Sequence, residues 1–250
     1  MFILLTNDDG INSNGINTIY KVLSISHRVV VIAPESEMSA TSHSISLHSP
    51  LRVKKIDNTH YAVNGTPTDC INLALFHILK EKPDLIISGI NQGPNLGTDV
   101  SYSGTVAAAL EGAILGIKSI AASCVDYRVK NLIPHSEFIK FFIRNIKHQK
   151  SLFKGSFINI NMPANLSGPP YNFEITRLSS RRYDKVIEKR KDPRGREYFW
   201  IAGEPMNTDN GRGTDVYVLN HNMISITPIQ IDQTDYKRIR ILKKYLKGLK

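Results

Sequence analysis

The sequence alternates short apolar runs with stretches of helical periodicity, and this alternation restricts the possible folds more than any other feature. The runs Phe2–Thr6, Val29–Ala33, Asp84–Ser88 and Ser119–Ser123 are typical of strands buried on both faces of a sheet. The alanine-rich segment Thr105–Leu115 predicts a helix that packs closely on that sheet. Alternation over the first two thirds of the chain predicts right-handed βαβ units. We therefore expect an α/β fold with a mainly parallel sheet flanked by helices.

A strand pair and a further helix are expected between the second and third of these strands. Leu51–Ile56 and His60–Val63 are strand-like segments on either side of the turn-forming pair Asp57-Asn58. Thr66-Pro67-Thr68-Asp69 is typical of a helix start, because proline is well tolerated in the first helical turn. Another helix is expected directly after the first strand, with four apolar residues at core-facing spacing: Ile16, Ile19, Val22 and Leu23.

The last third of the chain loses the βα pattern and predicts an arm and a tail. Asp192-Pro193-Arg194-Gly195 is a turn sequence between two strand-like stretches, which predicts a protruding β-hairpin arm over about residues 180–201. Residues 234–250 predict a basic amphipathic C-terminal helix. The apolar stripe of this helix contains Leu242, Tyr245, Leu246 and Leu249. Because no repeat or low-complexity linker divides the sequence, residues 1–250 are expected to form one domain.

The formal net charge of +10 makes nucleic acid a candidate partner, so the location of the basic residues matters. Residues 237–250 carry seven basic and no acidic side chains, and residues 180–198 carry eight basic and four acidic ones. The rest of the chain is close to neutral, which favours a solvated arm and tail over a basic binding cleft. Nucleic acid is therefore not the expected partner, and an RNA-binding or interaction module using the arm and tail is kept as the alternative function.

Several features favour a cytoplasmic protein without a membrane partner. No apolar run approaches the ~20 residues needed to span a bilayer. Met1–Leu5 contains no basic leader and no small-residue cleavage site, which argues against a signal peptide. Cys70 and Cys124 are too few for a disulfide framework and lack the spacing of a zinc site, so a reducing setting is expected.

The first polar segment at a strand end is Thr6-Asn7-Asp8-Asp9-Gly10. In open α/β sheets, ligands bind beyond the carboxyl ends of the strands. Adjacent carboxylates leaving a buried strand repel each other unless a proton or a cation offsets them, and their oxygens suit Mg²⁺ or Mn²⁺. The alternative is that Asp9-Gly10 forms a turn while Asp8 caps the next helix.

Two more polar segments are expected at the same sheet edge. Ser88–Gly97 follows a predicted strand, and its glycines and asparagines allow close backbone approach and offer amide oxygens as ligands. Ser101–Thr105 supplies hydroxyls, a glycine and free amides at a helix start, which can hold a phosphate. The alternatives are a structural glycine-rich loop and a plain helix cap.

A hydroxyl-rich loop, Glu37–Ser44, follows the second predicted strand and could reach this edge. An ordinary Ser-rich surface loop is the simpler interpretation, and composition favours His43 as a bystander over a nucleophile or an acid. Taken together, the segments fit a divalent ion clamped to a phosphate that is attacked by water. A phosphatase in which Asp8 itself becomes phosphorylated would prefer an Asp-x-Asp pattern, whereas the acids here are adjacent.

At these residues the sequence resembles the survival-protein-E (SurE) nucleotidases, a family of bacterial and archaeal 5′-nucleotidases. The matching blocks occur in the family's order and cover nearly the whole chain: Ile3–Gly10, Gly65–Cys70, Ser88–Asn91, Tyr102–Ala108, Asp192–Gly195, Gly213–Asp215 and Ser225–Pro228. The resemblance implies a Rossmann-like body that hydrolyses nucleoside 5′-monophosphates. Some members also act on 3′-monophosphates and on short polyphosphate.

The resemblance also implies a site and an assembly. It maps one divalent ion per subunit, Mg²⁺ or Mn²⁺, onto Asp8, Asp9, Ser39 and Asn91. Asp8 and Asn91 are the candidate catalytic residues, and Asp8 could orient or deprotonate the attacking water. Phosphate contacts map onto Asn95, Ser103, Gly104 and Thr105. A homodimer or homotetramer that exchanges the hairpin and the tail between subunits is expected.

Two positions depart from the family's pattern. The residue after Ser39 is usually glycine and is Ala40 here, which would strain the loop and could displace Ser39 if that position needs a positive φ. The usual Ala-Pro-Gly after the acidic turn is Ser13-Asn14-Gly15 here, so the proline is lost and Gly15 is kept. Neither change touches a carboxylate ligand, and we expect activity to survive both.

Overall fold

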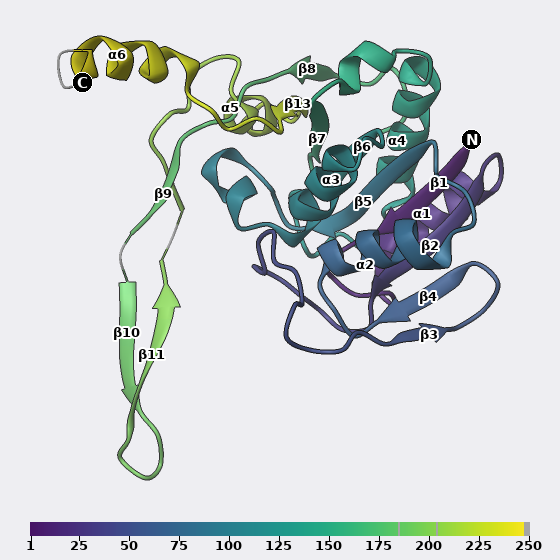
Figure 1. Ribbon diagram of the computed structural model, residues 1–250, viewed down its shortest axis with the longest axis horizontal. Helices are drawn as coiled ribbons and strands as arrows, with labels where there is room; N and C mark the ends of the chain where they lie inside the picture. The colour runs from purple at the N-terminus through teal and green to yellow at the C-terminus, as the bar shows by residue number, and fades with distance from the viewer. Residues whose placement is uncertain (185, 204, 248–250) are drawn as a thin grey trace.

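A computed structural model describes residues 1–184, 186–203 and 205–247 of the chain. The main sheet consists of β1 Phe2–Thr6, β2 Arg28–Pro34, β3 Val53–Lys55, β4 His60–Val63, β5 Leu85–Gln92, β6 Ser119–Cys124, β7 Ser156–Met162, β8 Phe173–Ile175 and β13 Ile224–Gln230. Their order within the described ranges is β3-β4-β2-β1-β5-β6-β7-β13-β8 (Figure 1). The strands from β4 to β7 run parallel, and β13 is antiparallel to β7.

Helices cover both faces of this sheet: α1 Asn14–Ser24 and α4 Ile133–Ile146 pack on one face, and α2 Pro67–Leu73 and α3 Gly104–Ile114 pack on the other (Figure 1). The remaining helical elements are α5 Asp215–Asn220, the tail helix α6 Tyr236–Leu246, a π-helical turn η1 Ala74–Ile78 and the 3₁₀ turns η2 Gly97–Ser101 and η3 Lys150–Phe153. The predicted α/β architecture, a mainly parallel sheet flanked by helices, is confirmed.

Strand β1 shows why the sheet needs a helical layer on each face. All its residues are buried, and successive side chains point to opposite faces. Ile3 and Leu5 pack in one core cluster with residues of α1 and α4. Leu4 packs in a second cluster with residues of α2 and α3. A strand without a polar face is stable only when both faces are covered.

The strand order reverses next to β1, and this reversal locates the site. From β1 the chain builds outward through β2 on one side, and from β5 it builds outward through β6 and β7 on the other. The loops after β1 and β5 therefore leave the sheet in opposite directions and open a crevice at its carboxyl edge. Asp8 and Asp9 follow β1, and Asn91 lies near the end of β5.

Several predicted boundaries are wrong. β3 is shorter than Leu51–Ile56, because only Val53–Lys55 pairs with β4 and all three residues are exposed at the sheet edge. β5 does not end at Ser88: after a register shift, Asn91 and Gln92 pair with β6, so part of the predicted loop is strand. β2 also continues through Pro34, because Pro34 retains its pairing with β4.

The arm and the tail form at the predicted places. β10 Val186–Lys191 and β11 Glu197–Ala202 pair antiparallel around the predicted turn and extend away from the main sheet (Figure 1). At the root of the arm, β9 Arg181–Tyr183 pairs with β12 Pro205–Asn207. The tail helix α6 is shorter than predicted and has no buried residue. Leu249 of the expected stripe lies outside the described residues.

Two further observations concern the expected setting of the chain. No helix in the described ranges combines the length and apolar character required to cross a bilayer. Cys70 and Cys124 are both buried, free thiols. The cytoplasmic location stays a prediction.

Gly15 allows α1 to approach β5 closely, and replacing it tests that contact. A Cβ at Gly15 would lie 1.9 Å from the carbonyl oxygen of Ile90. Gly15→Ala should therefore lower the free energy of unfolding by about 1–3 kcal/mol, the usual cost of overpacking, as measured by urea denaturation. Gly168 has no atom within 4 Å of such a Cβ, so Gly168→Ala is the control and should not lower stability. Equal denaturation midpoints for the two variants would contradict the close approach.

Candidate functional site

A cavity of about 280 Å³ opens at the carboxyl ends of β1 and β5. Six of the predicted site residues line it: Asp8, Asp9, Ser39, Asn91, Asn95 and Ser103. A larger cavity of about 800 Å³ lies near Tyr236 and is lined by none of the predicted residues. Because chemistry depends on converging functional groups more than on volume, the smaller cavity is the candidate site.

Two carboxylates, the buried Asp8 and the half-buried Asp9, dominate the electrostatics of this cavity. Asp8 accepts a hydrogen bond from Thr105 Oγ1, whereas Asp9 Oδ2 is buried without a hydrogen-bond partner in the part of the chain that the structure describes. Burial raises the pKa of Asp8, and the Thr105 hydrogen bond opposes this shift. Burial together with the neighbouring Asp8 charge raises the pKa of Asp9 to about 7. A bound cation would offset this repulsion.

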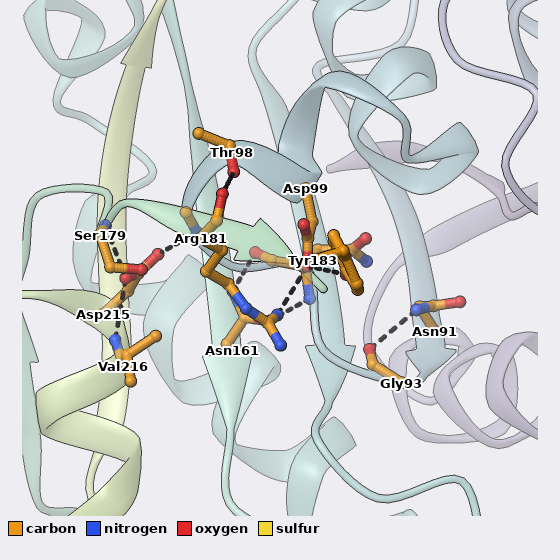
Figure 2. Close-up of polar contacts among 12 residues, drawn as sticks. Asn91, Gly93, Thr98, Asp99, Asn161, Ser179, Arg181, Tyr183, Asp215 and Val216 are labelled. Atoms are coloured by element: carbon orange, nitrogen blue, oxygen red, sulfur yellow. Dashed lines mark hydrogen bonds and ion pairs between the residues drawn. The ribbon is translucent and has the colours of Figure 1, made fainter. Parts of the chain in front are cut away.

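The donor set fits a hard divalent cation. The described ranges hold no cluster of three or more His, Cys, Asp or Glu side chains placed to bind a metal. Asn91 Nδ2 donates to Gly93 O at 2.8 Å, and this orients the Asn91 amide so that Oδ1 is available to a ligand (Figure 2). Carboxylate, amide and hydroxyl oxygens are donors that suit Mg²⁺ or Mn²⁺. The unpaired Asp9 oxygen fits this interpretation.

Asp8 is not a helix cap. The N-cap of α1 is Ser13, so this part of the alternative interpretation is wrong. The chain bends at Asp8 and Asp9, Gly10 has a φ of +90°, and a turn follows in which Ser13 N donates to Gly10 O at 3.0 Å. The bend and the carboxylate pair therefore coexist, because the bend leaves both acids just beyond β1.

The predicted phosphate segment divides between the cavity wall and the support of Asp8. Ser103 lines the cavity and is the N-cap of α3, where its Oγ accepts a hydrogen bond from Val106 N at 3.1 Å. A Cβ at Gly104 would lie 2.9 Å from Asp8 Cβ, so glycine is required for the helix to start this close to Asp8. Thr105 is fully buried and faces Asp8. The role of these residues in holding phosphate stays a prediction.

Ser39 lies in a loop that is anchored at several points. Its Oγ donates to Glu37 Oε1 at 2.7 Å, and Met38 N donates to Asp8 O at 2.7 Å. Ser42 N donates to Tyr102 O at 3.0 Å. His43 Nε2 lies 2.7 Å from Glu111 Oε2. His43 does not line the cavity, so its contact with α3 anchors the loop and agrees with a bystander role in the chemistry.

The root of the arm forms part of the cavity wall, which sequence reasoning missed. Arg181 Nη1 donates to Asp99 Oδ2 at 2.6 Å, and Tyr183 Oη donates to the same oxygen at 2.8 Å (Figure 2). Asp99 and Tyr183 both line the cavity. A local pattern could not reveal this contact, because it joins residues 82 and 84 positions apart.

A buried carboxylate fixes the loop beside this wall. Asp215 Oδ2 accepts a hydrogen bond from Gly97 N at 2.7 Å, and its Oδ1 accepts one from Ser179 N at 2.9 Å (Figure 2). Asp215 thus connects the start of α5, the 3₁₀ turn η2 and the chain leading into the arm. The block Gly213–Asp215 is visible in the sequence, but its role depends on this tertiary contact.

A Rossmann-like sheet whose switch point holds paired carboxylates beside a helix amino terminus is typical of an enzyme acting on phosphate-containing ligands. Residues 3–185 match the model of the family described as survival protein SurE. The chain therefore belongs to the SurE family, and the predicted family membership is confirmed.

Relatives and a solved structure agree with this membership. The chain is 44% identical over 253 residues to the 5′-nucleotidase SurE of Heliobacterium modesticaldum, covering 99% of this chain and 93% of that protein. It is 45% identical over 256 residues to the 5′-nucleotidase SurE of Pelotomaculum thermopropionicum, covering 100% and 97%. The crystal structure of the SurE protein from Aquifex aeolicus is 37% identical and superposes with a TM-score of 0.87, covering 99% of this chain and 100% of that chain.

Ala40 has a φ of +56°, so the loop carrying Ser39 does require the left-handed conformation at this position. For alanine, the left-handed conformation lowers the stability of the folded state by about 1–2 kcal/mol. Glycine avoids that strain, but it makes the unfolded chain more flexible, which lowers the free energy of unfolding by about 0.4–1 kcal/mol. Ala40→Gly should therefore raise the free energy of unfolding by up to about 1 kcal/mol in urea denaturation. Ala164, which lacks a positive φ, is the control: Ala164→Gly should destabilise the chain. A similar decrease in the free energy of unfolding in both variants would show that Ala40 is unstrained.

Proposed function

We propose that this chain is a metal-dependent phosphomonoesterase that hydrolyses nucleoside 5′-monophosphates to nucleoside and phosphate. The observation that carries the proposal is the adjacent pair Asp8 and Asp9 at the switch point, where Asp9 Oδ2 is buried without a hydrogen-bond partner in the described ranges. The two relatives described above are both 5′-nucleotidase SurE proteins, which supports the substrate class. Nucleoside 3′-monophosphates and short polyphosphate are proposed as secondary substrates.

The proposed chemistry divides among residues around the cavity. Asp8, Asp9, Asn91 and Ser39 would hold one Mg²⁺ or Mn²⁺ per subunit, which when bound supplies a positive charge that activates water and neutralises the phosphate. Asp8 would orient or deprotonate the attacking water, because Thr105 occupies only its Oδ1. Asn95 and Ser103 line the same cavity and would hold non-reacting phosphate oxygens.

The alternative function in RNA binding is not favoured. The basic excess lies in the arm and tail, outside the cavity that the acidic and amide residues form. The curated relatives named above are nucleotidases over nearly the full length of this chain.

Asp8→Asn tests the proposed role of the acidic pair. The substitution keeps the shape of the side chain but removes its charge, so release of phosphate from a panel of nucleotides should fall by roughly 10²–10⁴-fold, the usual contribution of a positioned base. Urea stability should not fall, because a buried charge is removed. EDTA should abolish wild-type activity, and added Mg²⁺ or Mn²⁺ should restore it.

Asp84 provides the matched control, because it lies just before β5, at the opposite edge of the sheet, where Oδ2 accepts a hydrogen bond from Phe2 N at 2.7 Å. Asp84→Asn should leave turnover unchanged. Near-normal turnover in Asp8→Asn, or activity that is insensitive to EDTA, would disprove the proposed chemistry.

We further propose a homodimer or homotetramer in which the arm and tail are exchanged between subunits. Exposed apolar side chains support this assembly: Ile187 is 66% exposed, Trp200 58% and Ile201 93%. The tail helix also exposes Leu242, Tyr245 and Leu246. Exposed apolar surface of this kind is typical of an interface.

Ile187 and Ile201 face each other across the arm, so a charge at each position tests the assembly. The double variant Ile187→Lys and Ile201→Lys should shift the mass measured by light scattering toward the 28.1 kDa of one chain, because lysine resists burial in an interface. Ile25→Lys is the control, since Ile25 is 77% exposed at the end of α1. A wild-type mass of one chain, or a double variant with unchanged mass, would rule out the arm as an interface.

A further inference from the structure

Three asparagines are joined by hydrogen bonds beside the candidate site. Asn95 lies in the loop after β5, and Asn159 and Asn161 lie on β7. Asn159 Nδ2 and Asn161 Nδ2 both donate to Asn95 O, at 2.8 and 2.9 Å. Asn95 N donates in turn to Asn161 Oδ1 at 2.8 Å. Asn161 therefore pairs with both backbone groups of a single residue.

Core packing alone does not explain asparagine at these positions. Asn159 and Asn161 are fully buried, and the alternate residues Ile158 and Ile160 fill the core on the other face of β7. Burying an amide is unfavourable unless hydrogen bonds replace its contacts with water. Asn159 Oδ1 still has no partner among the described residues, so this arrangement keeps a polar cost that apolar side chains would avoid.

The pairing determines how Asn95 meets the cavity. Its backbone N–H and C=O are both held from β7, and its Nδ2 donates to Ser123 Oγ on β6 at 2.8 Å. Asn95 is buried but lines the cavity that contains Asp8 and Asp9. An amide nitrogen carries two hydrogens, so one remains for an anion. The side chain is thus held in one orientation before any ligand arrives.

We infer that Asn161 is a positioning residue for phosphate transfer, which acts through Asn95, and that Asn159 and Ser123 support the same orientation. The inference rests on the proposed function, because it assigns Asn95 a contact with the substrate phosphate. Pre-orientation of this kind lowers the activation free energy of phosphate transfer, because the loop need not reorganise during the reaction. The residues on β7 touch no substrate themselves.

A double-mutant cycle separates positioning from stability. Asn161→Leu keeps a similar volume and removes both hydrogen bonds, so kcat/KM for a nucleoside 5′-monophosphate should fall roughly 10- to 100-fold, as expected for small misplacement of a binding group. In an Asn95→Ala background the same substitution should have almost no further effect on kcat/KM. Its effect on urea stability should persist in both backgrounds, because the buried amide is lost in each.

Ile160→Ala is the matched control on the same strand. It should lower stability through a core cavity while leaving kcat/KM within about twofold, because Ile160 faces the other side of the sheet. Ser123→Ala is a smaller change that removes the bond to Asn95 Nδ2, so it tests the inference if Asn161→Leu does not fold. We expect Ser123→Ala to lower kcat/KM several-fold, and this loss should vanish in the Asn95→Ala background.

Two kinds of result would overturn the inference. If the decreases in kcat/KM caused by Asn161→Leu and Asn95→Ala multiply in the double variant, or if Asn95→Ala leaves kcat/KM unchanged, Asn161 does not act through Asn95. Wild-type kcat/KM in both Asn161→Leu and Ser123→Ala would also overturn the inference. A wild-type chain that releases no phosphate from any nucleotide would instead overturn the proposed function, and with it the inference, which makes the two failures distinguishable.

Discussion

The placement of two adjacent carboxylates just beyond β1 is the constraint on which the site depends. Asp8 is buried and Asp9 is half-buried, and neither the loss of water nor their mutual repulsion favours the charged forms. Neighbouring elements reduce this cost in part: Thr105 at the start of α3 donates to Asp8, and the backbone of Gln92 in β5 opposes the rise in the pKa of Asp9. Because Asp9 Oδ2 receives no hydrogen bond in the described part of the chain, the polypeptide leaves one position for a positive ligand.

The same constraint explains why backbone groups approach so closely around the cavity. Helix α3 can start beside Asp8 only because Gly104 has no side chain. The loop carrying Ser39 reaches the edge because Met38 N binds Asp8 O, although Ala40 must then adopt a left-handed conformation. Local strain and tight packing are thus concentrated at the positions that bring oxygen donors together, as is common at functional sites.

The sequence was sufficient to predict the elements whose signal is local. Apolar runs located the buried strands, and the rule that ligands bind at the carboxyl edge placed Asp8, Asp9 and Asn91 together. The sequence could not place Asp99 against Arg181, because that pair depends on how the arm leaves the sheet. It also could not separate the two roles within Ser103–Thr105, since hydroxyls at a helix start can cap, support a carboxylate or bind an anion.

Polar groups buried behind the site show how the sheet combines stability with function. In β1, the side chains from Phe2 to Leu5 are apolar on both faces and pack into the core. In β7, one face carries Ile158 and Ile160, while the other gives up apolar contact for Asn159 and Asn161. The amides of β7 bind the loop after β5, as Asp215 does from α5 through Gly97. A loop held from two elements at its backbone loses little further entropy when it meets a ligand, so the cost of ordering it is met during folding.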